Sequence, residues 1–269
     1  MHPRISLHQV AFLEQRTATF LAHCRRIGVA HASLVTSVLD RPGEIDGART
    51  ELIAGGVDVP TLNHPFGRCP DLEHDAGGAS EQLLRAVAVA ESLGATAIYL
   101  LTGGRGSLSW EQAAERFATL IDTGRAAAAR AGITLLVENA SPFNADIHIA
   151  HTLGDAITLA ELAGTGLCID LHACWAEAGL TKLFERAMPR TGLIQVSDYV
   201  LGDRSAPCRS VPGDGDIPLR RLIDDLLTAG YTGLFDLELV GPRIEAEGPA
   251  AATRRAAEWL SELLTELGA

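Results

Sequence analysis

The sequence has little of what nucleic-acid-binding and membrane proteins require. Only 22 of its 269 residues are Lys or Arg, against 34 Asp and Glu, so the formal net charge is −12 at pH 7. Phosphate recognition needs a dense basic face, and the chain contains no basic run of five to eight residues. No apolar run reaches the roughly 18 residues that a membrane-spanning helix needs. We therefore expect neither a nucleic acid nor a membrane as a partner.

Cysteines are few and follow no pairing pattern. They are odd in number and include no C-x-x-C pair, standing at Cys24, Cys69, Cys168, Cys174 and Cys208. This usage predicts no disulfide framework and indicates a reducing compartment. The first four residues lead directly into the strand-like residues 5–8, which leaves no room for a signal peptide. We therefore expect a cytoplasmic protein.

Aromatic residues are also scarce, at 5 % of the chain, whereas apolar residues make up 47 % and glycine occurs 27 times. Short β-rich apolar runs alternate with longer amphipathic stretches, and the starts of the runs lie 26 to 42 residues apart. A βα unit needs about 30 residues. The runs begin near Arg4, His31, Val59, Ala97, Thr134, Leu167, Leu193 and Phe235. Eight such units predict an α/β fold, a single (β/α)8 TIM barrel over residues 1–269.

Helix signals fall between these runs. Ser109 and Gln112 have the spacing of a capping box, and further helices are predicted over residues 81–93, 218–229 and 251–267. A doubly wound open sheet is the alternative fold. That fold would place a G-x-G-x-x-G motif after the first strand, where this chain has His8-Gln9-Val10-Ala11.

Polar residues end each predicted strand, where barrels of this type carry their reaction site. These residues are His8, Thr36, His64, Thr102, Glu138, Asp170 with His172, Gln195 with Asp198, and Glu238. Burying a carboxylate at the end of an apolar strand is costly unless it is paired or bound to a metal.

Three of these strand ends are acidic, and their strands contain no Lys or Arg to neutralise them. One acidic residue in such a place is commonly a helix cap or an ion pair, but three on matched strands favour a shared cation. The predicted ligands are Glu138, Asp170, Gln195 and Glu238. This all-oxygen set favours one divalent ion, Mn²⁺ or Mg²⁺, with Co²⁺ or Zn²⁺ as alternatives.

The segments VENA, LCID and IQVSD, the run from Arg209 to Ile217 and the strand ending at Glu238 resemble the xylose-isomerase-like TIM-barrel superfamily. This superfamily comprises sugar isomerases and epimerases, and the resemblance covers essentially the whole chain. Q-x-x-D followed by R-x-x-P-G-x-G-[DE]-I looks most like the hydroxypyruvate isomerase branch. The ketose 3-epimerases share the arginine and the P-G-x-G stretch.

The resemblance implies proton transfer at a carbon next to a carbonyl. Glu138 and Glu238 would be the catalytic pair and would also bind the metal, together with Asp170 and Gln195, which replaces the commoner His. Substrate-binding roles are predicted for His8, His64, His172, Trp175 and Arg209. Phe66 is predicted to wall the pocket beside Trp175.

Two of these assignments leave alternatives open. Relatives commonly place His three residues after the strand-six Asp, where this chain has Ala173. His172, one residue earlier, would face a ligand only if the chain has already left the strand. Arg209 could instead form an ion pair with Asp198 or Asp214.

The function predicted from the sequence is a metal-dependent isomerase or epimerase of a small polyhydroxy carbonyl compound. A dehydratase or lyase using the same enolate is the alternative. A nuclease and a non-catalytic binding barrel are further hypotheses. Many members of the superfamily are dimers or tetramers, so the resemblance also implies a homodimer or homotetramer.

Overall fold

The computed structural model describes residues 1–66 and 71–269, and in these residues eight parallel strands close into a barrel in chain order. The strands are β1 Ile5–His8, β2 His31–Val35, β3 Asp58–Pro65, β4 Ala97–Leu101, β5 Thr134–Glu138, β6 Gly166–Asp170, β7 Thr191–Val196 and β8 Leu234–Leu237. The barrel closes where β1 pairs with β8, with Ile5 opposite Phe235. The predicted (β/α)8 barrel is confirmed, and the open sheet is wrong.

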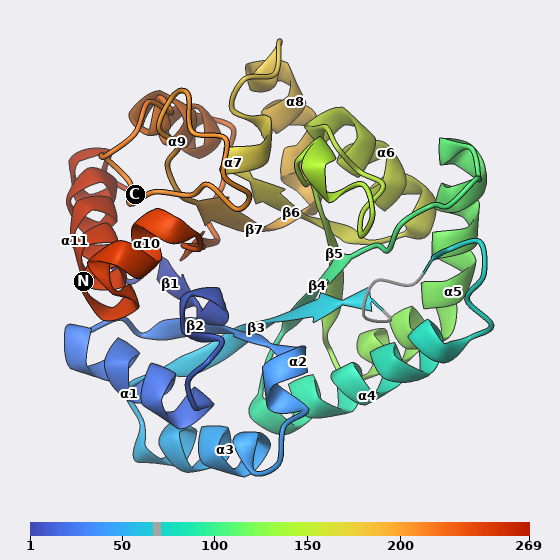
Figure 1. The fold of residues 1–269 in the computed structure, drawn as a ribbon, viewed down its shortest axis with the longest axis horizontal. Helices are drawn as coiled ribbons and strands as arrows, with labels where there is room; N and C mark the ends of the chain where they lie inside the picture. Colours follow the sequence, from blue (N-terminus) through green and yellow to red (C-terminus); the bar gives the residue numbers. More distant parts are fainter. Residues whose placement is uncertain (67–70) are drawn as a thin grey trace.

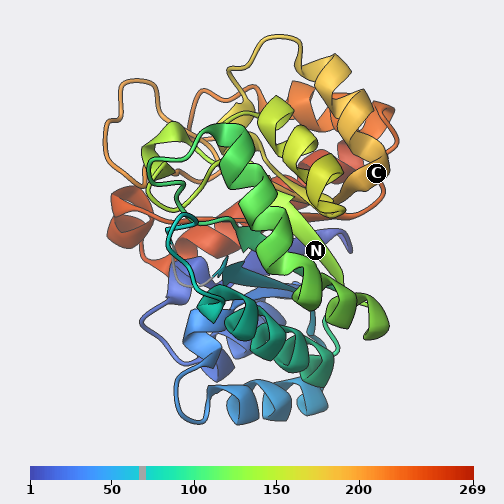
Figure 2. The same cartoon turned by 90° about the vertical axis from the view of Figure 1, so that its right-hand side faces the viewer.

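Helices surround the barrel (Figures 1 and 2). The longer ones are α1 Thr17–Ile27, α3 Glu44–Ala54, α4 Gly78–Leu93, α5 Trp110–Arg130, α6 Leu153–Ala163, α8 Leu180–Ala187, α9 Leu219–Thr228 and α11 Pro249–Glu266. Shorter elements lie in the connections: α2 Thr36–Leu39, α7 Leu171–Cys174, α10 Pro242–Glu247, and the 3-10 helices η1 Gln9–Phe12, η3 Pro142–Asn144 and η4 Met188–Arg190.

The capping box predicted at the start of α5 is present. The Ser109 hydroxyl accepts a hydrogen bond from the Gln112 main-chain N–H at 3.3 Å, and the Gln112 side chain accepts one from the Ser109 N–H at 2.9 Å. Two N–H groups that the helix itself cannot satisfy are thereby bonded. The other predicted helices also form, with ends shifted by at most three residues.

Two apolar layers hold the barrel together. The larger lies between the strands and the surrounding helices, and a smaller cluster of Tyr99, Leu136, Cys168 and Leu193 packs separately from it. These four residues come from the successive strands β4 to β7. Tyr99, Leu136 and Cys168 lie two residues before the end of their strands, and Leu193 lies three residues before the end of β7. Because alternate residues of a strand share a face, this cluster fills the inside of the barrel beneath its mouth.

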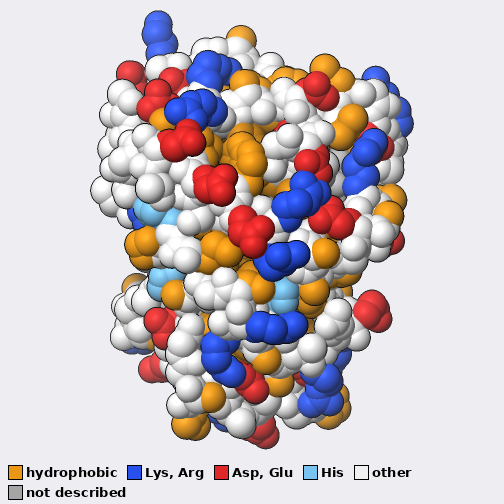
Figure 3. Space-filling view, turned by 90° about the vertical axis from the view of Figure 1, so that its left-hand side faces the viewer, with side chains coloured by type: hydrophobic (Ala, Val, Ile, Leu, Met, Phe, Trp, Pro, Cys, Tyr) orange, Lys and Arg blue, Asp and Glu red, His pale blue; other side chains and the backbone are white. Residues whose placement is uncertain are grey.

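One face of the molecule carries acidic and basic side chains close together. On the face that includes α1 and α11, acidic and basic side chains are interspersed (Figure 3), as in the pair of Arg254 and Glu258 at 3.6 Å. Across the described ranges, no helix combines the length and the apolar character needed to span a bilayer. Cys69 lies outside the described residues, and the other four cysteines are free thiols.

Candidate active site

A cavity of about 450 Å³ opens at the carboxyl ends of the strands. Small-molecule sites commonly occupy ~300–1,000 Å³. Seven strands contribute a lining residue at or near their ends: His8, Val35, Asn63, Leu101, Glu138, Asp170 and Glu238. The cavity therefore lies where the barrel fold predicts a reaction site.

Three carboxylates converge on one side of this cavity. One oxygen each of Glu138, Asp170 and Glu238 lies within 4.8 Å of the others, and all three side chains are buried. Burial, with repulsion from Glu238 and Asp170, raises the pKa of Glu138 well above its ordinary value. Burial likewise raises the pKa of Glu238, to about 7. The surroundings therefore disfavour full ionisation of the cluster, because they do not fully compensate three negative charges.

Arg209 provides part of that compensation. Its guanidinium donates to both carboxylate oxygens of Asp170, at 2.8 and 3.1 Å, to Ser197 Oγ at 2.9 Å, and lies 2.6 Å from Glu238 Oε2. Burial opposes its charge, but Asp170 and Glu238 outweigh that effect and raise the pKa of Arg209. When all three carboxylates are ionised, the cluster and the guanidinium together carry two net negative charges, which one divalent cation would balance.

Asp198 is not the ion-pair partner of Arg209, which pairs with Asp170 and Glu238. The Asp198 side chain has another role. Its carboxylate accepts main-chain N–H bonds from Tyr199, Gly213, Gly215 and Ile217, at 2.8 to 3.1 Å. Asp214 pairs with Arg255 instead of Arg209. A side chain at position 215 would meet Asp198 Oδ1 at 2.4 Å, so the P-G-x-G stretch needs its second glycine. Asp198 thus fixes the loop that carries Arg209.

Gln195 fits the role of the fourth ligand. It is fully buried in β7, where it pairs with Asp170 of β6 and with Asp236 of β8 in the strand register. Among the described residues, neither its amide oxygen nor its amide nitrogen has a hydrogen-bond partner. Buried polar groups are nearly always bonded, so this side chain indicates a missing partner beside the carboxylates.

Asn139 is a site residue that the sequence analysis missed. Its side chain accepts from the Asp170 main-chain N–H at 2.9 Å and donates to the Asp170 carbonyl at 3.0 Å. This reciprocal pair joins the ends of β5 and β6. The VENA motif contained the signal, because an amide directly after a strand-end acid can bond the neighbouring strand.

The chain leaves strand β6 directly after Asp170, and α7 begins at the next residue. The Asp170 carboxylate accepts the His172 main-chain N–H at 3.0 Å and caps this helix. The turn brings the His172 side chain to the cavity, where its Nε2 lies 3.8 Å from Cys208 Sγ. Burial, with the nearby Arg209 charge, lowers the pKa of His172 to about 4, so its ring is neutral at pH 7.

Two aromatic residues of the prediction lie away from the cavity lining. Trp175 packs against Tyr199, with 6.4 Å between ring centroids, and Tyr199 in turn meets the His172 ring edge-on at 5.9 Å. Trp175 therefore supports His172 from behind. Phe66 is fully buried and packs against Phe117 of α5.

His8 ends β1 and lines the cavity, but both ring nitrogens are already bonded. Nδ1 accepts the Val10 main-chain N–H at 3.0 Å, and Nε2 lies 2.6 Å from the Tyr99 hydroxyl. Since Nδ1 is an acceptor, the neutral ring carries its proton on Nε2 and donates it to Tyr99. Burial lowers the pKa of His8 to about 4, which keeps the ring neutral.

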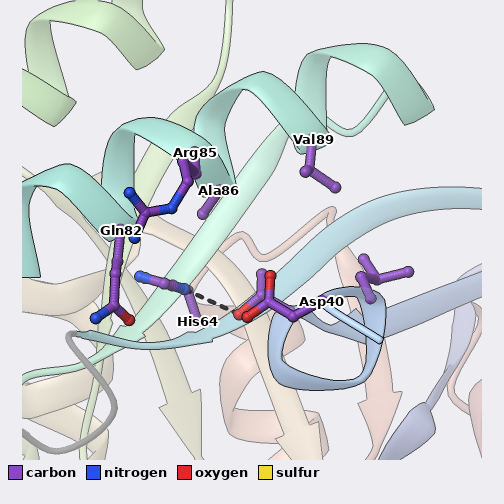
Figure 4. A pocket seen from close by; sticks show the side chains of 8 residues that line it. Asp40, His64, Gln82, Arg85, Ala86 and Val89 are labelled. Carbon is purple, nitrogen blue, oxygen red and sulfur yellow. Dashed lines mark hydrogen bonds between the residues drawn. The ribbon is translucent and has the colours of Figure 1, made fainter. Parts of the chain in front are cut away.

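His64 lies on the other face of its strand. It borders a separate hollow of about 200 Å³ between β3 and α4, together with Asp40, Gln82 and Arg85 (Figure 4). Its Nδ1 lies 2.9 Å from the Thr36 hydroxyl. Neighbouring strand residues point to opposite faces, so Asn63 lines the central cavity in its place.

Comparison with known proteins agrees with this geometry. The sequence profile of a family described as the xylose isomerase-like TIM barrel matches residues 21–263. A Streptomyces coelicolor protein provisionally named hydroxypyruvate isomerase is 29 % identical over 222 residues, 76 % of this chain and 77 % of that protein. Fructoselysine 3-epimerase of Shigella flexneri is 23 % identical, over 93 % of this chain and 99 % of that protein.

Solved structures share the fold. The IOLI protein with a bound zinc atom superposes with a TM-score of 0.82 at 14 % identity, covering 98 % of this chain and 99 % of that one. A xylose isomerase-like TIM barrel protein from Mycobacterium smegmatis in complex with magnesium gives 0.70 at 18 % identity, covering 99 and 98 %. With the barrel, the strand-end carboxylates and the profile match in agreement, the chain belongs to the xylose isomerase-like TIM barrel family.

Proposed function

We propose that this chain is a divalent-metal-dependent isomerase or epimerase of a small polyhydroxy carbonyl compound. The observation that carries the proposal is the cluster of Glu138, Asp170 and Glu238, buried together at the mouth of the barrel. When fully ionised, the cluster carries two negative charges more than Arg209 offsets. The names of the two relatives, an isomerase and an epimerase, support the same reaction class.

The residues that would hold the metal are Glu138, Asp170, Gln195 and Glu238. Their oxygen donors suit Mn²⁺ or Mg²⁺, and the zinc and magnesium named in the two similar structures leave the identity of the ion open. When bound, the ion supplies positive charge opposite the negative charge that develops on the substrate oxygens.

Glu138 and Glu238 are the proposed proton-transfer pair. Glu138 ends β5, and Glu238 immediately follows β8. The two side chains therefore reach the cavity from strands that β6 and β7 separate. A general base works best with a pKa near the working pH, and both pKa values are raised from the ordinary glutamate range. One glutamate removes a proton from the carbon next to the carbonyl, and the other returns a proton.

Arg209 and His172 are proposed to position the substrate. Arg209 holds Asp170 in place with two hydrogen bonds and borders the cavity, where it can bond a substrate oxygen. His172 is neutral and lies on the same side. His8 lines the cavity and stays a proposed substrate-binding residue, whereas His64 and Trp175 lie outside the cavity lining.

Proton exchange with solvent tests the proposal. Hydroxypyruvate and ketohexoses, incubated in D₂O with the Mn²⁺-loaded protein, are expected to gain deuterium next to the carbonyl, as seen by proton NMR. EDTA treatment should stop the exchange, and Mn²⁺ should restore it. An exchange rate that EDTA treatment leaves unchanged would contradict the metal requirement. A product that has lost water would instead establish the dehydratase alternative.

Partner and assembly predictions complete the proposal. We propose a small molecule, rather than nucleic acid or a membrane, as the partner, with a cytoplasmic location. A homodimer or homotetramer, implied by the family resemblance, is tested by light scattering of the purified protein.

A further inference from the structure

The cavity has two unlike sides. Opposite the carboxylates, the connections after β1 and the ends of β2 to β4 present an apolar wall, formed by Val10, Leu13, Val35, Pro65 and Leu101. The apolar lining also includes Pro207, Val240 and Phe143 of η3, a residue that is 85 % exposed. Charged residues of the described lining gather on the β5 to β8 side.

Polar groups on the apolar side are few and partly used. His8 bonds Val10 and Tyr99 through its two ring nitrogens, which leaves Asn63 and Ser37 as polar lining side chains on that side within the described residues. Hydroxyls that lose water without gaining a partner incur a free-energy cost. An apolar group placed there would instead gain from leaving water.

We propose that the substrate of this cavity is amphipathic. Its carbonyl and hydroxyl groups lie against the carboxylates, and a substituent of several apolar carbons lies against Val10, Leu13, Val35, Pro65 and Leu101. The placement of the polar end rests on the proposed function, whereas the apolar subsite rests on the wall alone. A fully hydroxylated chain of the same length is the poorer ligand.

Hydroxamic acids separate the two parts of the proposal, because they share one metal-chelating head and differ in their tails. Calorimetry compares acetohydroxamate, hexanohydroxamate and the polyhydroxylated gluconohydroxamate, each with and without Mn²⁺. Each buried methylene is expected to tighten binding about threefold, so the hexyl compound should bind at least about tenfold tighter than either of the others.

The outcomes are distinct. Equal affinity of the hexyl and polyhydroxy tails, or tighter binding of the polyhydroxy tail, overturns the apolar subsite. A tail preference that persists while Mn²⁺ has no effect on binding supports the subsite and contradicts the metal part of the proposed function.

Variants locate the subsite. Leu101→Gln and the nearly isosteric Val35→Thr should each reduce the hexyl advantage at least threefold, because each puts a polar group in the wall. Leu84→Gln on the outer surface of α4, 37 % exposed, is the matched control and should keep the full advantage. Should Leu101→Gln fail to fold, Val35→Thr retains the test. An unchanged advantage in Val35→Thr would overturn the assignment.

Discussion

The two halves of the barrel mouth share one scaffold and differ in chemistry. Strands β5 to β8 bring Glu138, Asp170, Gln195 and Glu238 to the mouth. Three of them are acidic, and the fourth is an amide that has no hydrogen-bond partner in the described part of the chain. At the corresponding ends, β1 to β4 bring His8, Val35, Asn63 and Leu101. The difference teaches that the barrel fold alone does not determine the chemistry of its mouth. Here the β5 to β8 half carries the groups of the proposed reaction, and the β1 to β4 half forms the wall that selects the shape of the substrate.

Removing a proton-transfer group should produce the largest contrast between the halves. Glu138→Gln and Glu238→Gln are each expected to lower turnover by about 10²–10⁴-fold. Asn63→Ala, on the other half, should lower it less than about tenfold. Steady-state rates check this, with thermal unfolding of each variant as the control for folding. A glutamine variant with full activity would contradict the assigned roles.

Arg209→Met should be the next largest effect, this time on stability. It leaves Asp170 and Glu238 buried without their guanidinium, which costs about 3–5 kcal/mol for a buried pair. Urea unfolding of the metal-free protein measures the loss, and added Mn²⁺ should recover part of it.

Arg255→Met is the matched control for Arg209. Arg255 pairs with Asp214 and Glu247 at the surface, with 43 % of its side chain exposed, so its loss should cost less than about 1 kcal/mol. Equal losses of unfolding free energy in the two variants would contradict the claim that Arg209 compensates buried carboxylates.

The metal-free protein should lose stability as the pH rises through neutrality. The pKa of Glu238 is raised by burial from 4.5 to about 7 in the folded chain, so the folded state binds more protons than the unfolded state in that interval. The favourable contribution is complete below pH ~4.5 and disappears as the pH passes ~7. Urea unfolding between pH 5 and 8 should show this fall in the wild type and a smaller fall in Glu238→Gln.

The smallest effect is expected at His64, because it faces the hollow outside the barrel wall. His64→Gln should change turnover less than about threefold. A loss of tenfold or more in the steady-state rate, with the thermal unfolding temperature retained, would show that this side chain reaches the substrate.

Particular residues show what the sequence can and cannot predict. The sequence predicts the eight strands and the acidic residues at three of their ends, because apolar runs that end in a carboxylate form a strong local pattern. It does not decide between Asn63 and His64, because β3 is buried on both faces and alternation disappears. Whether His172 faces the cavity depended on the residue at which β6 ends. The hydrogen-bond partners of Asp198 are main-chain amides of a loop, and no sequence spacing predicts where these amides lie.

The central claim, a single divalent cation held by the β5 to β8 half, is tested most directly by titrating Mn²⁺ into EDTA-treated wild type and Gln195→Leu in a calorimeter. We predict one ion per wild-type chain and affinity weakened at least about tenfold in Gln195→Leu. The metal-free variant should be as stable as the wild type or more so, because the amide that it loses bonds to none of the described residues. No bound ion, or equal affinity in the two proteins, would contradict the account.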